Sequence, residues 1–309
     1  MEVRMEPVVG RFAPTPSGRL HLGNILCAML SYLSVRHQGG RFLLRIEDVD
    51  VPRCPHSLSE QVIRDLSWLG FTWDEPPLFQ SERTDVYAQR LDFLSAQGLT
   101  YPCFCTRAQL QSLLAPNLGD TQLVYPGTCR NLTPAEIMRL SAKHSPSVRL
   151  RVPCEDVAFT DGLYGNVREN LAQDCGDFVL RRSDGLFGYQ LAVVVDDGLC
   201  GVNEVVRGRD ILSATPRQIY LQRCLGFSTP HYIHIPLLTD AHGRRLAKRD
   251  RDLDLSALQK RYAPEEILGI LASAAGLTDC YRPVTLQELA EDFSWAKIRK
   301  EDMRLRFPG

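Results

Sequence analysis

A histidine and an asparagine three residues apart, near the start of the chain, could together hold a phosphate. Val8–Phe12 before them predicts a short buried strand, and the apolar residues after them recur at helical spacing: Leu22, Ile25, Leu26, Met29, Leu30 and Leu33. The run between strand and helix contains two prolines and Gly18, which stiffen and turn it. The first backbone N–H groups of the helix, and the positive end of its dipole, should therefore face a ligand above the sheet. His21 and Asn24 open this helix one turn apart, so the spacing predicts a nucleotide-phosphate site.

Acidic residues follow the next predicted strand. Arg41–Ile46 is expected to be a parallel strand, and it leads directly into Glu47, Asp48 and Asp50. In open α/β sheets, ligands bind at the carboxyl ends of the strands. These acids could form a solvated loop, a metal site or a site that reads an ammonium group.

Alternating strands and helices are expected to position these groups. A helix is predicted from about Leu58 to Leu69, where Gly70 stops it, and another from Thr84, a good N-cap, to Gly98. Together with the two strands, these helices make the first half of a doubly wound domain.

Sheet periodicity returns in the second half of the chain. Phe187–Asp197 and Val202–Asp210 are predicted as neighbouring buried strands, and a helix is predicted from Thr215 to Gly226. Tyr232–Leu238 is expected to be the last strand. A further helix is predicted near the end of the chain, at residues 263–275.

Cysteines gather in the segment between the two halves, from Tyr101 to about Asp177, where prolines are frequent and periodicity is poor. Cys103 and Cys105 form a Cys-x-Cys turn, and Cys129 follows in a later loop. Such a turn can place two thiolates on one ion and the later cysteine can supply a third, whereas zinc needs about four donors in a tetrahedron. Reduced buried cysteines without a metal are the alternative.

Composition points to a globular protein of the reducing cytoplasm. Of 309 residues, 44% are hydrophobic and 24% are charged, and the net charge of −1 leaves any nucleic-acid contact to a local basic face. The ten cysteines lack the spacing of a disulfide framework, and no charged-then-apolar leader precedes the first strand. The longest aliphatic run, Leu191–Val195, is too short to span a bilayer, so no membrane partner is expected.

Two segments resemble the signature motifs of class I aminoacyl-tRNA synthetases. Pro14–Asn24 is similar to the HIGH motif, and Arg11–Gly18 resembles in particular the glutamate and glutamine branch. About 225 residues later, Arg245–Arg249 resembles the KMSKS motif, with arginine at its first position and, at Ala247, alanine in place of the usual serine. The resemblance implies catalysis by His21 and Lys248, and ATP binding by His21, Gly23, Asn24 and Lys248. The ammonium of Lys248 would meet the negative charge that develops on the leaving pyrophosphate.

The same resemblance implies a pocket for glutamate. Its residues would be Arg11, Phe12, Ala13, Pro14, Thr15, Glu47, Tyr189 and Arg207. Physical chemistry agrees, because two arginines and one glutamate nearly balance the two carboxylates and one ammonium of this amino acid, and an arginine fork matches a planar carboxylate. Glutamyl-type synthetases also commonly carry a zinc knuckle in the inserted segment. The resemblance implies one structural zinc ion held by Cys103, Cys105, Tyr125 and Cys129, with His144 as a possible substitute for the tyrosine.

The resemblance is greatest to the glutamyl-queuosine tRNA(Asp) synthetases, a branch that resembles a glutamyl synthetase reduced to its catalytic core. Only about 60 residues follow Asp250, too few for the anticodon-reading domains of full glutamyl synthetases or the barrels of glutaminyl ones. The implied reaction activates L-glutamate with ATP and Mg²⁺ without tRNA, and then transfers it to queuosine in tRNA(Asp). Two alternatives stay open: a short glutamyl-tRNA synthetase that charges a tRNA 3′ end, and an inactive paralogue that binds ATP or RNA.

The expected fold is an α/β, Rossmann-like, doubly wound parallel sheet with an inserted α+β zinc subdomain and a C-terminal helical segment. The expected divisions are residues 1–98 and 181–250 for the two halves of the nucleotide-binding domain, 99–180 for the insertion, and 251–309 for the helical segment. The resemblance implies a monomer.

Overall fold

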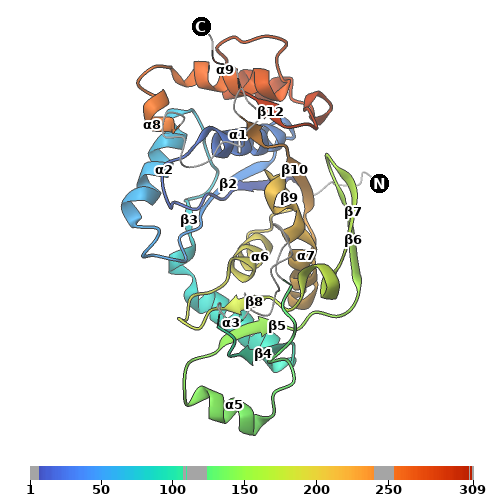
Figure 1. Ribbon diagram of the computed structural model, residues 1–309. Helices are drawn as coiled ribbons and strands as arrows, with labels where there is room; N and C mark the ends of the chain where they lie inside the picture. The colour runs from blue at the N-terminus through green and yellow to red at the C-terminus, as the bar shows by residue number, and fades with distance from the viewer. Residues whose placement is uncertain (1–6, 107–108, 110–123, 240–253, 306, 308–309) are drawn as a thin grey trace.

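One parallel sheet forms the centre of the computed structural model, which describes residues 7–106, 109, 124–239, 254–305 and 307 (Figure 1). Its five strands lie in the order β10-β9-β1-β2-β3, and each neighbouring pair is parallel. They are β1 (Val9–Phe12), β2 (Arg41–Ile46), β3 (Leu78–Phe79), β9 (Glu204–Gly208) and β10 (His231–Ile235). The chain order reverses between β1 and β9, which is the switch point beside which such sheets bind ligands. The predicted Rossmann-like class is confirmed.

Helices cover both faces of the sheet. One hydrophobic core contains Phe42 and Leu44 of β2, and the other contains Leu43, as expected for side chains that alternate across a strand. The first core also holds α1 (Leu22–His37), α2 (His56–Trp68) and α9 (Pro264–Ala275). The second holds α3 (Thr84–Ala96), α6 (Tyr189–Leu199) and α7 (Thr215–Leu225). The helices predicted around residues 58–69, 84–98, 215–226 and 263–275 are confirmed, although Thr84, expected as an N-cap, is the first helical residue of α3.

The predicted strand at Phe187–Asp197 is wrong, because most of this segment is helix α6. Every residue of α6 from Leu191 to Asp197 is buried, since the helix packs on the sheet and against α3 and α7. A helix buried all around shows no apolar periodicity, and three consecutive valines favour a strand by propensity. The sheet gains β3 instead, which at two residues is too short to leave a pattern in the sequence.

The predicted strand at Tyr232–Leu238 is divided in two. β10 ends at Ile235, and Pro236, which has no N–H to donate to a ladder, separates it from β11 (Leu238–Thr239). β11 pairs with β12 (Met303–Arg304) near the end of the described chain.

The inserted segment forms two small antiparallel sheets. β4 (Thr100–Cys103), β5 (Ser147–Leu150) and β8 (Val179–Arg181) make one, and α5 (Pro134–Ser141) lies at the lower end of the molecule in Figure 1. The other is a hairpin of β6 (Asp156–Asp161) and β7 (Gly165–Asn170), which stands beside β10 and α7. The hairpin turn touches β10 closely: Gly162 donates its N–H to the Tyr232 carbonyl at 2.9 Å, and a Cβ at Gly162 would lie 2.8 Å from Ile233.

The C-terminal segment packs on α1. It contains α8 (Leu255–Leu258), α9 and α10 (Leu286–Glu291), whose apolar residues join the same core as those of α1. Trp295 Nε1 donates to Ser34 Oγ of α1 at 3.0 Å. Short helical turns complete the described chain: η1 (Gln80–Glu82), η2 (Leu171–Cys175), η3 (Arg209–Ala214) and η5 (Trp295–Lys297). Among the described residues, none of the helices combines enough length and apolar character to cross a membrane.

Candidate active site

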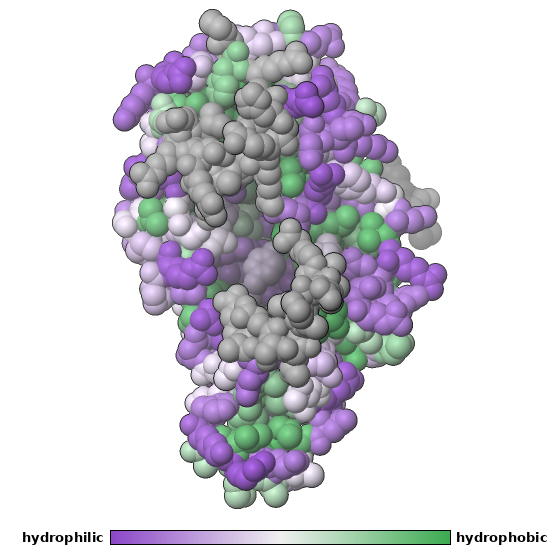
Figure 2. Space-filling model, in the orientation of Figure 1, coloured by the Kyte–Doolittle hydropathy of each residue, from purple (hydrophilic) through white to green (hydrophobic). Residues whose placement is uncertain are grey.

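A cleft of about 380 Å³ opens where β1, β2, β9 and β10 end. The space-filling view shows the molecule hollowed near the middle of one face (Figure 2). The cleft is lined by His21 and Asn24 at the start of α1, by Glu47 after β2, by Tyr189 at the start of α6 and by Arg207 of β9. Residues from four separate parts of the chain, singled out in the sequence, therefore meet in one place.

His21 caps helix α1 with its own side chain. Its Nδ1 accepts hydrogen bonds from the backbone N–H groups of Gly23 at 3.1 Å and Asn24 at 3.4 Å, and Asn24 Oδ1 accepts from the His21 N–H at 3.3 Å. An added Cβ at Gly23 would lie only 3.0 Å from His21 Cε1, so a glycine suits this position. With Nδ1 accepting, a neutral imidazole carries its proton on Nε2.

This cap differs from the geometry expected from the sequence. The backbone N–H groups of Gly23 and Asn24 and the Asn24 side chain were expected to point at an anion, but they make hydrogen bonds with His21. The positive end of the α1 dipole still faces the cleft.

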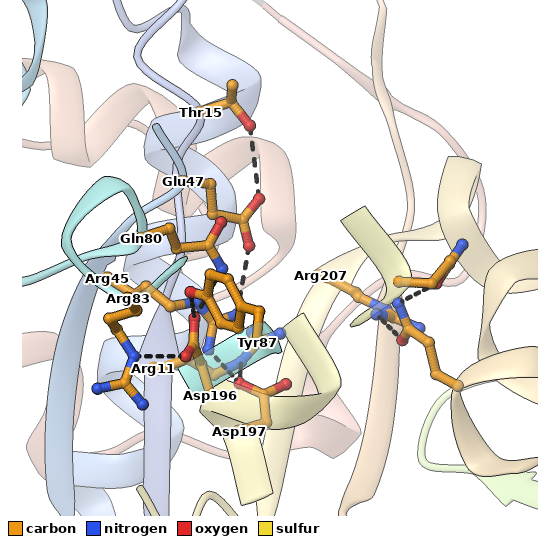
Figure 3. A network of polar contacts seen from close by, with 12 residues as sticks. Arg11, Thr15, Arg45, Glu47, Gln80, Arg83, Tyr87, Asp196, Asp197 and Arg207 are labelled. Atoms are coloured by element: carbon orange, nitrogen blue, oxygen red, sulfur yellow. Dashed lines mark hydrogen bonds and ion pairs between the residues drawn. The ribbon is translucent and has the colours of Figure 1, made fainter. Parts of the chain in front are cut away.

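Asp197 of α6 joins two strands of the sheet through ion pairs. Its Oδ1 accepts from Arg11 Nε of β1 at 3.1 Å and from Arg45 Nη1 of β2 at 2.5 Å, and all three side chains are almost fully buried (Figure 3). Burial raises the pKa of the Asp197 carboxyl, but the charges of Arg11 and Arg45 outweigh burial and hold the pKa below its ordinary value.

The same network holds Glu47 from both sides. Arg45 Nη2 donates to Glu47 Oε1 at 3.2 Å, and Thr15 Oγ1 donates to Oε2 at 3.4 Å (Figure 3). The Glu47 side chain is 9% exposed, and its burial raises the pKa of the carboxyl despite the nearby charges of Arg45 and Arg11. The carboxylate predicted to read an ammonium is therefore fixed in position at the edge of the cleft.

A second buried carboxylate, Asp196, anchors α6 to the neighbouring elements. It accepts hydrogen bonds from Gln80 Nε2 at 2.8 Å, Arg83 Nε at 2.7 Å and the Tyr87 hydroxyl at 2.8 Å. Sequence reasoning missed Asp196, Asp197 and Arg45. It missed the two aspartates because it placed them in a strand, where neighbouring side chains point to opposite faces.

Arg11 and Arg207 are placed differently from one another. Arg11 is 5% exposed and faces Asp197, and the described residues that line the cleft include its neighbours Phe12, Ala13, Pro14 and Thr15 but not Arg11 itself. Arg207 does line the cleft, on a strand apart from the Asp197 network (Figure 3). Its guanidinium donates to His234, Gln218 and Thr215, and none of these three acceptors is a carboxylate.

The segment predicted to carry the second catalytic group, Lys248, lies outside the described residues, as do Arg245 and Ala247. The residues on either side of it lie at the cleft. Leu238 lines it, Asp254 forms a β-bridge with His21, and Leu255 N donates to the carbonyl of Leu20 at 3.0 Å.

The predicted zinc residues lie together in the inserted segment. The Sγ atoms of Cys103, Cys105 and Cys129 lie within 4.8 Å of one another, and those of Cys105 and Cys129 are 3.6 Å apart. The Tyr125 hydroxyl lies 3.4 Å from Cys103 Sγ and 3.5 Å from Cys105 Sγ. His144, the possible substitute, is exposed and packs its ring on Phe104 beside this cluster.

Comparison with known proteins agrees with the resemblance that the motifs of the sequence indicate. The family model described as "tRNA synthetases class I (E and Q), catalytic domain" matches residues 7–295. The chain is 47% identical over 308 residues to a Glutamyl-Q tRNA(Asp) synthetase of Symbiobacterium thermophilum, covering 96% of this chain and 95% of the relative. A protein of the same name from Nitratidesulfovibrio vulgaris is 48% identical over 285 residues, covering 89% of this chain and 88% of the relative. Among solved structures, a glutamate tRNA ligase from Elizabethkingia meningosepticum in complex with its amino acid superposes with a TM-score of 0.84 at 26% identity, covering 97% of this chain and 67% of that one.

We expect Asp197→Asn to lower the free energy of unfolding by about 3–5 kcal/mol, because it leaves two buried guanidinium groups without their shared carboxylate. Urea unfolding at pH 7 measures the effect. Glu75→Gln is the matched control, since Glu75 pairs with Arg41 at a site where both side chains are half exposed, and its loss should cost less than about 1 kcal/mol. An Asp197→Asn variant no less stable than the control would contradict this account of the network.

The pH dependence of this effect has a definite sign. Because the pKa of Asp197 is lowered in the folded state, its stabilising contribution is complete above the unfolded value of about 3.9 and is lost as the pH falls below it. The stability difference between the wild type and Asp197→Asn should therefore shrink as urea unfolding is repeated at lower pH.

Proposed function

The chain belongs to the class I tRNA synthetases of the glutamate and glutamine (E and Q) type, which are ligases, and we propose that it activates glutamate with ATP and passes the glutamyl group to queuosine in tRNA(Asp). The observation that carries the first step is the meeting of His21, Glu47 and Arg207 in one cleft at the switch point of the sheet. Ligands of open α/β sheets bind at such a switch point, and the volume of the cleft lies within the range of small-molecule sites.

The charges of the cleft suit glutamate. Glu47 would accept the ammonium group, and a bound cation favours the charged form of a carboxyl whose pKa burial has raised. Arg207 would bind a carboxylate with its guanidinium fork. Arg11 is buried and does not line the cleft. Its charge and its ion pair with Asp197 would help to hold the Glu47 carboxylate in position. Tyr189 and the residues from Phe12 to Thr15 would complete the pocket.

The activation step needs no protein nucleophile. The glutamate carboxylate attacks the α-phosphorus of ATP, a new carboxyl O–P bond forms, and the bond to the pyrophosphate breaks. The protein positions the two substrates and meets the charge that moves onto the leaving group. His21 would donate from Nε2 to a phosphate oxygen beside the positive end of α1, with Gly23 and Asn24 in support. Mg²⁺ accompanies ATP and neutralises part of the phosphate charge.

Lys248 would supply the mobile cation of this step. Leu238 lines the cleft before its segment, and Asp254, after it, pairs with His21. A chain that leaves and returns at the cleft can bring an ammonium to the pyrophosphate. This arrangement supports the role that the KMSKS-like motif implies.

The acceptor is proposed from the relatives. The proteins that align with this chain over nearly their whole length, at 47% and 48% identity, are named Glutamyl-Q tRNA(Asp) synthetase. The glutamate tRNA ligase of similar fold is matched over 67% of its length only. We therefore favour queuosine in tRNA(Asp) over a tRNA 3′ end as the acceptor, and glutamate activation before tRNA binds.

We also propose one structural zinc ion at Cys103, Cys105, Tyr125 and Cys129. The donor set fits, because two thiolates bound to one tetrahedral zinc lie about 3.8 Å apart, close to the 3.6 Å between Cys105 and Cys129. The guanidinium carbon of Arg149 lies 3.8 Å from the centre of the Tyr125 ring, where its charge offsets the excess negative charge of such a site. Zinc would fix the turn of β4 and the loop of Cys129 to each other.

We expect Lys248→Ala to slow glutamate-dependent pyrophosphate exchange by one to three orders of magnitude, on the order of 2–4 kcal/mol of barrier, because the leaving group loses its cation. The exchange is measured without tRNA. Lys260→Ala is the control, since Lys260 is an exposed lysine that follows the segment in the sequence and does not line the cleft, and its loss should leave the rate unchanged. An unaltered rate in Lys248→Ala would remove this lysine from the mechanism, and no exchange by the wild type would favour an inactive paralogue.

The acceptor is tested with tRNA(Asp) whose 3′-terminal adenosine has been removed. We expect labelled glutamate to become attached to this shortened tRNA when it carries queuosine, and not when guanosine occupies the same position. Intact tRNA(Glu) is the second substrate. Attachment to intact tRNA(Glu) and to no shortened tRNA would identify the chain as a short glutamyl-tRNA synthetase.

We expect purified protein to contain about one zinc ion per chain by elemental analysis, and Cys103→Ser to lose most of it, because the site would lose one of three sulfur donors. Cys280→Ser is the matched control, since Cys280 is exposed and outside the cluster. Equal metal content in the two variants, or none in the wild type, would count against this site.

A further inference from the structure

A line of three buried polar side chains leads from the inserted hairpin to the cleft. Asp161 Oδ2 of β6 lies 2.6 Å from His234 Nδ1 of β10, and His234 Nε2 lies 3.0 Å from Arg207 Nε of β9. The side chains of Asp161 and His234 have no exposed surface, and Arg207 is 4% exposed. Neither Asp161 nor His234 lines the cleft, so any effect on a ligand passes through Arg207.

Backbone groups fix the orientation of the Asp161 carboxylate. Its Oδ1 accepts from the N–H groups of Leu163 at 3.0 Å and Tyr164 at 2.9 Å, in the turn of the hairpin. Oδ2 is left to face His234, and it also accepts from the His234 backbone N–H at 3.1 Å. The carboxylate thus holds the ring and the backbone of one residue of β10.

This geometry selects one tautomer of His234. Nδ1 carries the proton and donates to Asp161, so the lone pair of Nε2 accepts from Arg207 Nε–H. Burial lowers the pKa of His234, and the charge of Arg207 lowers it further, against the effect of Asp161. A neutral ring is the form that can accept a hydrogen bond from a guanidinium.

Helix α7 fixes the rest of the guanidinium. Arg207 Nη1 donates to Gln218 Oε1 at 2.7 Å, and Nη2 donates to Thr215 Oγ1 at 2.6 Å. Each terminal nitrogen carries two N–H groups, so one on each remains for a ligand in the cleft. Three acceptors on two elements therefore determine the plane in which Arg207 can present its fork.

We infer that Asp161 and His234 are positioning residues for amino-acid recognition, which hold the Arg207 guanidinium in the orientation that binds a carboxylate in the cleft. The inference rests on the proposed function, because it takes glutamate as the ligand of Arg207. It adds two residues, one of them from the inserted hairpin, to the determinants of glutamate binding.

Asp161→Asn tests the orientation of the ring. The backbone N–H groups of Leu163 and Tyr164 require an oxygen at the Oδ1 position, so the amide nitrogen of the asparagine would face His234 Nδ1. The amide then donates to Nδ1, and the ring proton moves to Nε2, where it opposes Arg207 Nε–H. The His234 backbone N–H loses its bond to Oδ2 and keeps only the longer contact with Oδ1, at 3.4 Å. Asp156→Asn is the matched control, because Asp156 begins the same strand and pairs with Arg168 at the surface.

Two substitutions of His234 separate the contacts of Nε2, with Arg207 and with Thr215 Oγ1 at 3.1 Å, from the bond of Nδ1 to Asp161. Glutamine places an amide oxygen near the position of Nε2 and can accept from Arg207. Asparagine reaches only the position of Nδ1 and offers Arg207 no acceptor. Because both are amides of similar polarity, a difference between them reports the contacts at the Nε2 position, with Arg207 and with the Thr215 hydroxyl that also binds Arg207, and not the burial of a polar group.

The measurement is glutamate-dependent pyrophosphate exchange, with KM determined separately for glutamate and ATP. We expect Asp161→Asn and His234→Asn to raise KM for glutamate about 10- to 100-fold and to leave KM for ATP within about twofold. We expect both KM values of His234→Gln to stay within about fivefold of those of the wild type. We expect both KM values of Asp156→Asn to equal those of the wild type. Circular dichroism checks that each variant folds, and nitrogen NMR of labelled histidine checks the tautomer change in Asp161→Asn.

The outcomes distinguish the inference from the proposed function. A wild type without glutamate-dependent exchange would overturn both. An active wild type whose Asp161→Asn variant keeps the glutamate KM, or raises both KM values equally, would overturn the inference alone. Equal values for His234→Gln and His234→Asn would also overturn it, as would an unchanged His234 tautomer in folded Asp161→Asn.

Discussion

The pocket depends on one carboxylate shared by two guanidinium groups. Asp197 reaches from α6 to Arg11 and Arg45 on adjacent strands, and Arg45 in turn holds Glu47. Two positive charges against two negative ones leave this buried group of four nearly neutral, so the charges of the group balance one another without a further ion. Since the helix that supplies Asp197 also begins at Tyr189, the same contact fixes that side of the cleft.

Four basic residues of the strands lie on one face of the sheet. In four strands, an apolar residue of the second core is followed two positions later by a basic one: Val9 and Arg11, Leu43 and Arg45, Val205 and Arg207, Tyr232 and His234. Side chains two apart share a face, so all four basic residues lie on the face under α6 and α7. Arg45, Arg207 and His234 are level with one another near the carboxyl edge, and Arg11 lies two residues further back along the sheet. The opposite face carries α1 and α9 on a mainly apolar core, in which buried Glu204 of β9 accepts a hydrogen bond from Ser34 of α1.

Sequence reasoning found the parts of the site that local pattern determines. His21 starts a helix after a strand, while Glu47 and Arg207 stand near strand ends, and the structure brings them together. It missed the partners that hold them, because Asp197, His234 and Asp161 are recognisable only once distant segments are packed. The helix α6 was mistaken for a strand because burial on all sides removes periodicity. Even within the motif, the use of His21 Nδ1 as a cap depends on atomic contacts that spacing does not specify.

The close fit of the β6–β7 hairpin against β10 limits how modular this chain can be. A catalytic core trimmed of its insertion would keep every strand of the parallel sheet, yet it would lose the acid behind His234 and the turn that Gly162 presses onto the neighbouring strand. An inserted segment taken from another protein would need a carboxylate at the position of Asp161, within hydrogen-bond distance of His234 Nδ1. Lineages that remodel this hairpin are therefore constrained to change it in concert with the pocket, and attempts to graft it between relatives face the same coupling.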